Sequence, residues 1–107
     1  MALHHAAQGE VIDVRPYGAH IDAAQSIALF KSADLEVMRL VLPTGYRMPT
    51  HKVVGEITLQ CLEGVVEVEV ASDSHTLAAG HLMYVARGVT HALTATKAAS
   101  VLVAVAL

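Results

Sequence analysis

The sequence contains few cysteine and aromatic residues. Its 107 residues include one cysteine, Cys61, one phenylalanine and no tryptophan. A single cysteine can form neither an internal disulfide nor a zinc-ribbon ligand set, so no covalent staple holds this small chain together. Its lysines and arginines are scattered and its aromatic residues are few, so it lacks the basic stripe and stacking platforms that bind nucleic acid. We therefore predict no nucleic-acid partner.

Long apolar runs are also missing, although 54% of the residues are hydrophobic and only 16% are charged. The most continuous run, residues 98–107, is much shorter than the roughly 20 residues that a helix needs to span a bilayer. The first ten residues have no lysine or arginine before an apolar stretch, so they do not resemble a signal peptide. We expect a soluble, cytoplasmic protein with no membrane partner.

The chain does contain many short β-rich runs. We divide it into an N-terminal arm, residues 1–25, and a barrel, residues 26–107. In residues 65–70 valine alternates with glutamate, which is typical of a strand with one apolar and one charged face. We expect about nine short strands, including a hairpin of residues 56–62 and 65–71 around Glu63 and Gly64. Further expected strands are residues 35–42, 82–85, 91–96 and 100–107. This pattern predicts an all-β fold, a small closed antiparallel barrel or jelly roll.

The apolar surplus also bears on assembly. A chain of this size can bury one core, and a barrel this small has a limited interior. Surplus apolar strand faces tend to be buried against a partner subunit. We therefore predict a homodimer.

Histidine is abundant, with seven residues against seven lysines and arginines together. Most of these histidines have ordinary interpretations, as solvent-facing residues or as part of the arm; these are His4, His5, His20, His75 and His81. His51 and His91 differ because their spacing places them on neighbouring strands of the predicted barrel. These two are the candidates for metal or ligand binding.

Two glycine-framed segments, residues 45–64 and 80–95, resemble the two motifs of the cupin superfamily. The first motif is a glycine, five residues, His-x-His, three or four residues, a glutamate, six residues and a glycine; Gly45, His51 and Gly64 match it. The second is a glycine, five residues, Pro-x-Gly, two residues, a histidine, three residues and an asparagine, and Gly80 and His91 match it. The resemblance implies a small RmlC-like bacterial cupin, whose fold is a double-stranded β-helix, an antiparallel jelly-roll barrel.

The resemblance also implies a metal site. In metal-binding cupins the two histidines and the glutamate of the first motif and the histidine of the second hold one divalent metal, here Fe, Mn, Ni or Zn. His51 stands at the first of these positions and His91 at the last. Val53 stands at the second histidine position and cannot bind a metal, while Ala86 and Ala95 replace the proline and the asparagine of the second motif.

The glutamate position leaves two registers open. Counting back from Gly64 places Ile57 at the family's glutamate position, with Glu56 one residue earlier. A shift of one residue turns every side chain of a strand to its opposite face. In the family register, Ile57, Leu59 and Cys61 point into the barrel and only the two histidines remain as ligands.

A bulge at Gly55 gives the other register. The side chains that then point inward are polar: Glu56, Thr58 and Gln60. His51, Glu56 and His91 would form a 2-His-1-carboxylate metal site, with Gln60 as a further ligand. We favour this register because three polar residues at alternate positions of one barrel strand suggest a functional role.

The remaining candidates would line the pocket around this site: Tyr46, Arg47, Met48, Cys61, Met83 and Tyr84. Two functions follow from the resemblance. One is a metal-dependent oxygenase or lyase acting on a small molecule, and the alternative is a metal-free cupin that binds a small ligand as a sensor or accessory module.

Overall fold

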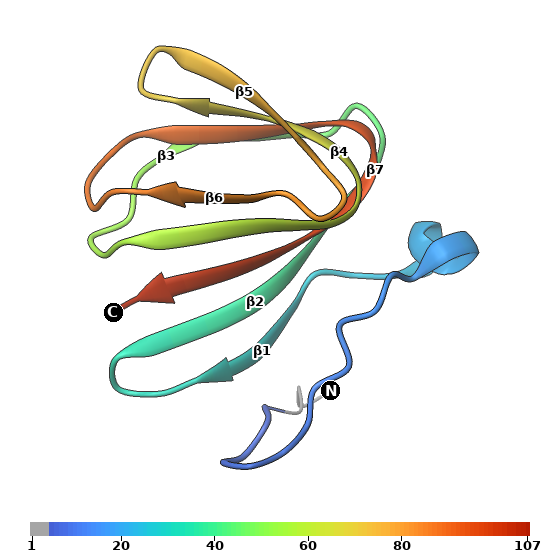
Figure 1. Ribbon diagram of the computed structural model, residues 1–107, viewed down its shortest axis with the longest axis vertical. Coiled ribbons are helices and arrows are strands. Elements are labelled where there is room, and N and C mark those ends of the chain that lie inside the picture. The colour runs from blue at the N-terminus through green and yellow to red at the C-terminus, as the bar shows by residue number, and fades with distance from the viewer. Residues whose placement is uncertain (1–4) are drawn as a thin grey trace.

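The computed structural model describes residues 5–107, which form antiparallel strands and one short 3-10 helix (Figure 1). The elements are η1 (Gly18–Ala23), β1 (Ile27–Lys31), β2 (Leu35–Leu42), β3 (Arg47–His51), β4 (Ile57–Val70), β5 (Asp73–Ala78), β6 (Leu82–Val85) and β7 (His91–Ala106). His4, which we assigned to the arm, lies outside the described residues. No helix within residues 5–107 is long and apolar enough to cross a membrane.

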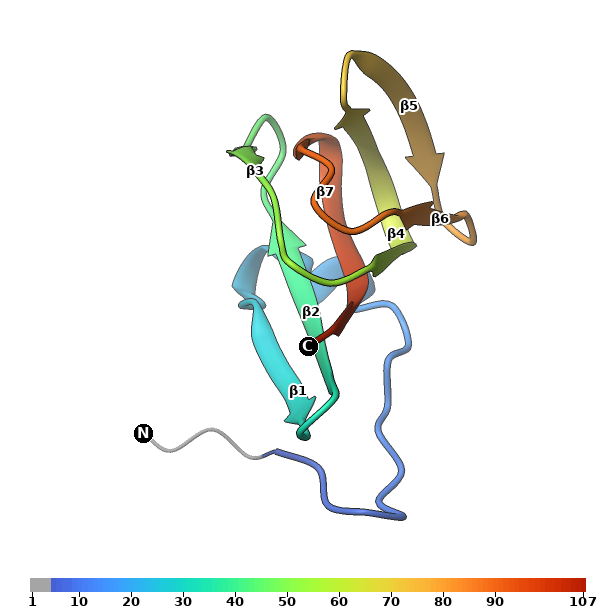
Figure 2. The same ribbon diagram turned by 90° about the vertical axis from the view of Figure 1, so that its left-hand side faces the viewer.

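The two longest strands, β4 and β7, pair with each other, and each contributes to both halves of the barrel. One half of the pair carries β2, on residues 99–106 of β7, and β6, on residues 57–60 of β4. The other half carries β3, on residues 91–94 of β7, and β5, on residues 65–70 of β4. The strands curl around a common interior (Figures 1 and 2), so the predicted all-β jelly roll is confirmed.

The predicted hairpin around Glu63 and Gly64 is wrong, because the chain bends there without reversing. β4 continues through both residues, and its pairing with β7 shifts register three times between Cys61 and Val66. Gly64 has a φ of +79°, and a Cβ at this position would overlap the backbone of Ala98 and Ala99. The glycine therefore lets β4 run close to the backbone of β7 where it bends from one half of the barrel to the other. Residues 91–96 and 100–107, which we expected as two strands, likewise form the single strand β7.

The core decides the register of β4. Ile57, Leu59 and Cys61 are at most 3% exposed and belong to the central apolar cluster, in contact with β7 residues such as Val101 and Val103. The bulged register that we favoured is therefore wrong. The physical reason is that it would have moved three apolar side chains to the surface and three polar ones into an apolar interior.

The arm has no strand among its described residues, and it is fastened to the barrel at Glu63 on β4. The carboxylate of Glu63 accepts hydrogen bonds from the backbone N–H groups of Tyr17 and Gly18, at 2.8 and 3.0 Å. Arg39 lies 3.8 Å from the centre of the Tyr17 ring, and its Nη2 donates to the carbonyl of Arg15. The arm therefore covers a charged cluster on the outer face of the sheet.

Candidate functional site

A small apolar cavity of about 100 Å³ lies between β2, β3, β4 and β7. Nine of its lining residues are hydrocarbon or thioether side chains: Met38, Leu40, Met48, Val53, Ile57, Leu59, Leu93, Val103 and Val105. His51 and His91 supply the polar side chains of the lining. We call this space the histidine cavity.

The four positions at which the resemblance implies metal ligands all line the histidine cavity. They are His51, Val53, Ile57 and His91. The fold therefore brings together residues from β3, the following loop, β4 and β7. Two imidazoles and two hydrocarbon side chains occupy the four positions.

His51 and His91 lie opposite each other in the pairing of β3 with β7. Their ring centroids are 4.3 Å apart and the ring planes are inclined by 59°. Nδ1 of His51 lies 3.0 Å from the carbonyl oxygen of Pro49, and Nδ1 of His91 lies 3.2 Å from that of Val89. A carbonyl oxygen can only accept, so each Nδ1 carries the proton and donates it. In the neutral rings Nε2 is therefore the atom with a free lone pair.

The two imidazoles differ in exposure. His91 is 3% exposed, whereas His51 is exposed at the edge of the barrel. Burial lowers the pKa of His91 below its usual value, and the nearby His51 lowers it further, against the opposing effect of the hydrogen bond to Val89. The buried ring therefore favours its neutral form, in which Nε2 can accept a hydrogen bond or bind a cation.

Glu56 and Gln60 do not join the histidines, so the predicted 2-His-1-carboxylate set is not formed. The cavity is lined by Ile57 and Leu59, and the alternate residues of β4 lie on the opposite face of the strand. The carboxylate of Glu56 accepts a 2.6 Å hydrogen bond from the hydroxyl of Tyr84. That hydrogen bond, together with burial and the charge of Glu56, raises the pKa of Tyr84.

Of the predicted pocket residues, Met48 lines the histidine cavity. Tyr46 and Tyr84 are 48% and 60% exposed, and neither contributes to the lining. Arg47 points to the exterior, where its guanidinium pairs with the carboxylate of Glu69 at 3.0 Å. The two tyrosines and the arginine therefore lie outside the lining of the histidine cavity.

Cys61 and Met83 belong to the core and not to the cavity lining. Cys61 is fully buried, and its thiol donates to the carbonyl oxygens of Glu63 and Gly64, at 3.3 and 3.6 Å. Burial raises the pKa of this thiol, which disfavours the reactive thiolate. Met83 pairs with Leu59 across the β4–β6 ladder and packs against the core.

The sequence reasoning missed several lining residues, including Met38 and Leu40 on β2. The signal was weak, because only Glu36 and Arg39 interrupt the apolar run of residues 35–42. Which face of this strand turns inward, and whether that face lies opposite the two histidines, depends on how the barrel closes.

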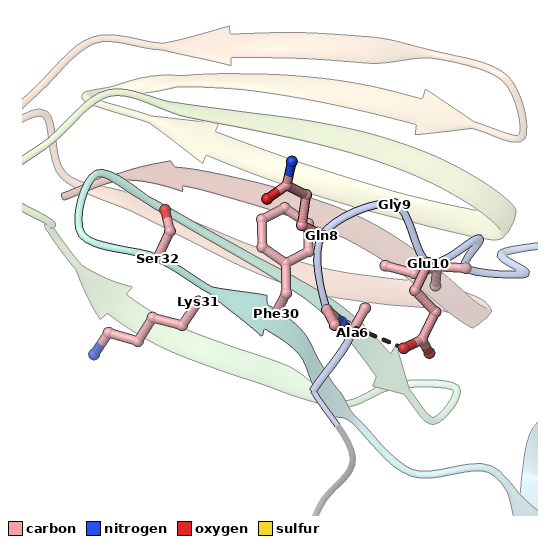
Figure 3. Close-up of a pocket in the computed structure, with 9 residues that line it drawn as sticks. Ala6, Gln8, Gly9, Glu10, Phe30, Lys31 and Ser32 are labelled. Carbon is pink, nitrogen blue, oxygen red and sulfur yellow. Dashed lines mark hydrogen bonds between the residues drawn. The ribbon is translucent and has the colours of Figure 1, made fainter.

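A larger groove of about 420 Å³ lies between the arm and β1 (Figure 3). Phe30 and the arm residues Gln8 and Gly9 border it, and the ammonium group of Lys31 points away from the arm. The backbone N–H of Ala7 donates to Glu10 within the arm, at 3.3 Å. Among the described residues, the titratable groups of this groove are Glu10 and Lys31, whereas the histidine cavity brings two imidazoles together, so the histidine cavity is the better candidate site.

No protein-family model and no curated protein matches this chain, but solved structures do. A cupin superfamily protein from Desulfitobacterium hafniense matches with a TM-score of 0.79 and 16% identity, over 100% of this chain and 99% of the other. A protein of unknown function from Streptococcus pyogenes matches with a TM-score of 0.75 and 21% identity, over 99% and 95% of the two chains. An RmlC-like cupin from Shewanella frigidimarina matches with a TM-score of 0.73 and 17% identity, over 98% and 91%. The chain has the fold of the cupin superfamily, as its two motifs predicted.

The divalent metal that this fold implies does not fit the residues present. Within residues 5–107 no three histidine, cysteine, aspartate or glutamate side chains come together in a metal-binding arrangement. Val53 and Ile57 have no lone pair to offer at the two remaining ligand positions. Two imidazoles alone lack the carboxylate that would reduce the charge of a bound divalent ion.

Proposed function

We propose that the protein binds a small, largely apolar molecule in the histidine cavity without the help of a metal ion. The observation that carries this proposal is the composition of the lining: nine apolar side chains surround the cavity, and His51 and His91 are its polar members. Small-molecule sites generally combine apolar walls with a few polar groups that orient the ligand. The protein would then act as a sensor or accessory module for that molecule.

The driving force for binding would come mainly from the apolar walls. Removing apolar surface from water stabilises a complex by about 25 cal/mol per Å². The two imidazoles cannot move freely, because each Nδ1–H is held by a backbone carbonyl. A held ring loses little conformational freedom on binding and fixes the orientation of the ligand.

The experiment compares two neighbouring valines. Val53 lines the cavity, whereas Val54 is 93% exposed and does not. We expect Val53→Phe to fill the cavity and Val54→Phe to leave it open. Titrations with toluene, cyclopentanol and 1-butanol, followed by amide chemical shifts, should show binding to the wild type and to Val54→Phe, with a loss of at least about tenfold in Val53→Phe. Equal binding by both variants, or none by the wild type, would contradict the proposal.

The alternative is a metal-dependent oxygenase or lyase that uses the two histidines. It is tested by incubating untagged protein with Fe(II), Mn(II), Ni(II) or Zn(II), removing free ion by gel filtration and measuring metal per chain. We expect less than stoichiometric metal. One ion per chain in the wild type, lost in His51→Ala but kept in His75→Ala, would replace our proposal with this alternative.

A further inference from the structure

The hydrogen bonding of the two imidazoles indicates the kind of ligand. We infer that the histidine cavity selects a neutral molecule with one polar end that donates a hydrogen bond, as a phenol or an alcohol does. This inference rests on the proposed function. Two features of the cavity favour this class of ligand: the hydrogen bonds that fix the protonated nitrogen of each ring, and a lining in which the described residues include no charged side chain.

Both rings present an acceptor. The carbonyls of Pro49 and Val89 hold Nδ1–H of His51 and His91, so Nε2 of each neutral ring is unprotonated. No residue in the described part of the chain donates a hydrogen bond to either Nε2. Each ring therefore carries an acceptor nitrogen, and the two rings line the same cavity with their centroids 4.3 Å apart.

The rest of the lining offers no competing polar group. Its side chains are those of methionine, leucine, isoleucine and valine. An acceptor group such as an ether or a carboxylate would lose its hydrogen bonds with water and find no donor on the neutral rings. Burying a polar group without a hydrogen bond costs about 1 to 3 kcal/mol. A ligand that donates avoids this cost.

The charges around the cavity disfavour both anionic and cationic ligands. A carboxylate ligand would need a cation at the cavity, but Arg47 lies outside it and is paired with Glu69. An ammonium ligand can donate, but it would need an anion, and Glu56, which directly precedes β4, lies outside the cavity and accepts a hydrogen bond from Tyr84. Isolated charges are costly to bury, so the cavity favours a neutral donor.

The volume of the histidine cavity limits the size of the ligand. The histidine cavity measures about 100 Å³. An engineered cavity of about 150 Å³ in another protein holds one benzene molecule. The histidine cavity is smaller, so a short aliphatic alcohol, or a single ring whose polar end extends to the exposed edge at His51, suits the space.

Three ligands with the same ring test the inference at pH 8, above the ordinary imidazole pKa of about 6.5. Phenol donates a hydrogen bond, anisole replaces the donor with a methyl ether, and benzoate carries a negative charge. We expect the wild type to bind phenol about tenfold more tightly than anisole, which is the upper range for one net hydrogen bond. Benzoate should bind most weakly. The side-chain ¹⁵N signals of Nε2 should shift with phenol and stay in place with anisole.

Two histidine variants separate recognition from folding. His51 is exposed, so His51→Ala should fold and lose most of its preference for phenol over anisole. His75 is exposed on β5, and His75→Ala should keep the preference. Anisole binding as tightly as phenol, or benzoate binding best, would overturn the ligand class while leaving small-molecule binding intact. Failure of phenol to bind would also overturn it, and failure of the toluene and alcohol titrations as well would overturn the proposed function itself.

Discussion

Two glutamates of β4 pair with arginines of neighbouring strands, and they show how burial changes the role of the same kind of pair. Arg39 and Glu63 have side chains that are 3% and 13% exposed, with a 3.2 Å contact. Arg47 and Glu69 make a 3.0 Å contact, but both side chains are about half exposed. Glu63 also accepts a 2.7 Å hydrogen bond from Ser100. The buried pair forms part of a network that joins the arm to three strands, β2, β4 and β7, while the exposed pair is a surface contact.

Removing Glu63 should therefore cost far more stability than removing Glu69. Glu63→Ala leaves the Arg39 guanidinium buried without its partner, which we expect to cost about 3 kcal/mol of unfolding free energy. Glu69→Ala should change the free energy of unfolding little, because solvent screens an exposed pair. Urea unfolding followed by circular dichroism measures both. Equal losses in the two variants would contradict the importance of burial here.

The carboxylate of Glu63 should also make the stability of the fold depend on pH in the acidic range. Although burial raises the pKa of Glu63, hydrogen bonds from Tyr17, Ser100 and Gly18 and the charge of Arg39 lower it overall, below the usual 4.5. A lowered folded-state pKa stabilises the fold above the unfolded value, and this stabilisation is lost as pH falls through the folded value. We expect the stability gap between wild type and Glu63→Gln to be full at pH 6 and to shrink below about pH 4.5. A gap that stays constant down to pH 3 would contradict this account.

At the scale of elements, the bend of β4 depends on one glycine. Gly64 and Gly80 both have positive φ, at +79° and +89°. A Cβ at Gly64 would overlap the backbone of Ala98 and Ala99, whereas a Cβ at Gly80 would meet no atom within 4 Å. The two positions share the backbone conformation and differ in the space available.

Alanine substitutions at these two glycines should separate the stability cost of the backbone conformation from the cost of steric overlap. Gly80→Ala should cost about 1 to 2 kcal/mol, the usual penalty for a side chain in the left-handed region. Gly64→Ala should cost about 3 kcal/mol or more, because neighbouring backbone must move as well. Thermal and urea unfolding of both variants gives the comparison. Similar costs at the two sites would show that the close contact between β4 and β7 at Gly64 tolerates a side chain.

Elements differed in how well their sequences predicted them. The runs that became β2 and β6 were predicted with their observed bounds, because turn residues stand at both ends. β4 and β7 were each predicted as two strands. Local sequence around Gly64 shows a residue that permits positive φ, and this is compatible with either a hairpin turn or a bend. Only the pairing of β4 with β7 along their whole lengths decides between them.

At the scale of the whole molecule, the homodimer expected from composition stays a prediction. The outer face of the sheet formed by β2, β7, β4 and β6 carries apolar side chains, with Leu35 38% and Tyr84 60% exposed beside Ala104 and Ala106. A second copy of the chain could bury this face by two-fold symmetry. We expect a dimer by light scattering at micromolar concentration and a monomer after Leu35→Glu, while His75→Glu on the distant β5 stays dimeric. A monomeric wild type would contradict the prediction.

The motif spacing in the sequence by itself determined the cupin fold and the pairing of His51 with His91, because glycines and histidines at fixed intervals specify where strands begin and meet. The tertiary structure alone decided what surrounds them. In residues 56–61 polar and apolar side chains alternate, so the same sequence is compatible with either face of the strand turned inward. Packing against Val103 and Val105 buried Ile57 and Leu59 and left Glu56 outside. Burying three apolar side chains stabilises the fold, whereas burying three polar side chains without hydrogen-bond partners would destabilise it. For this reason the cavity is apolar and a carboxylate ligand is absent from it.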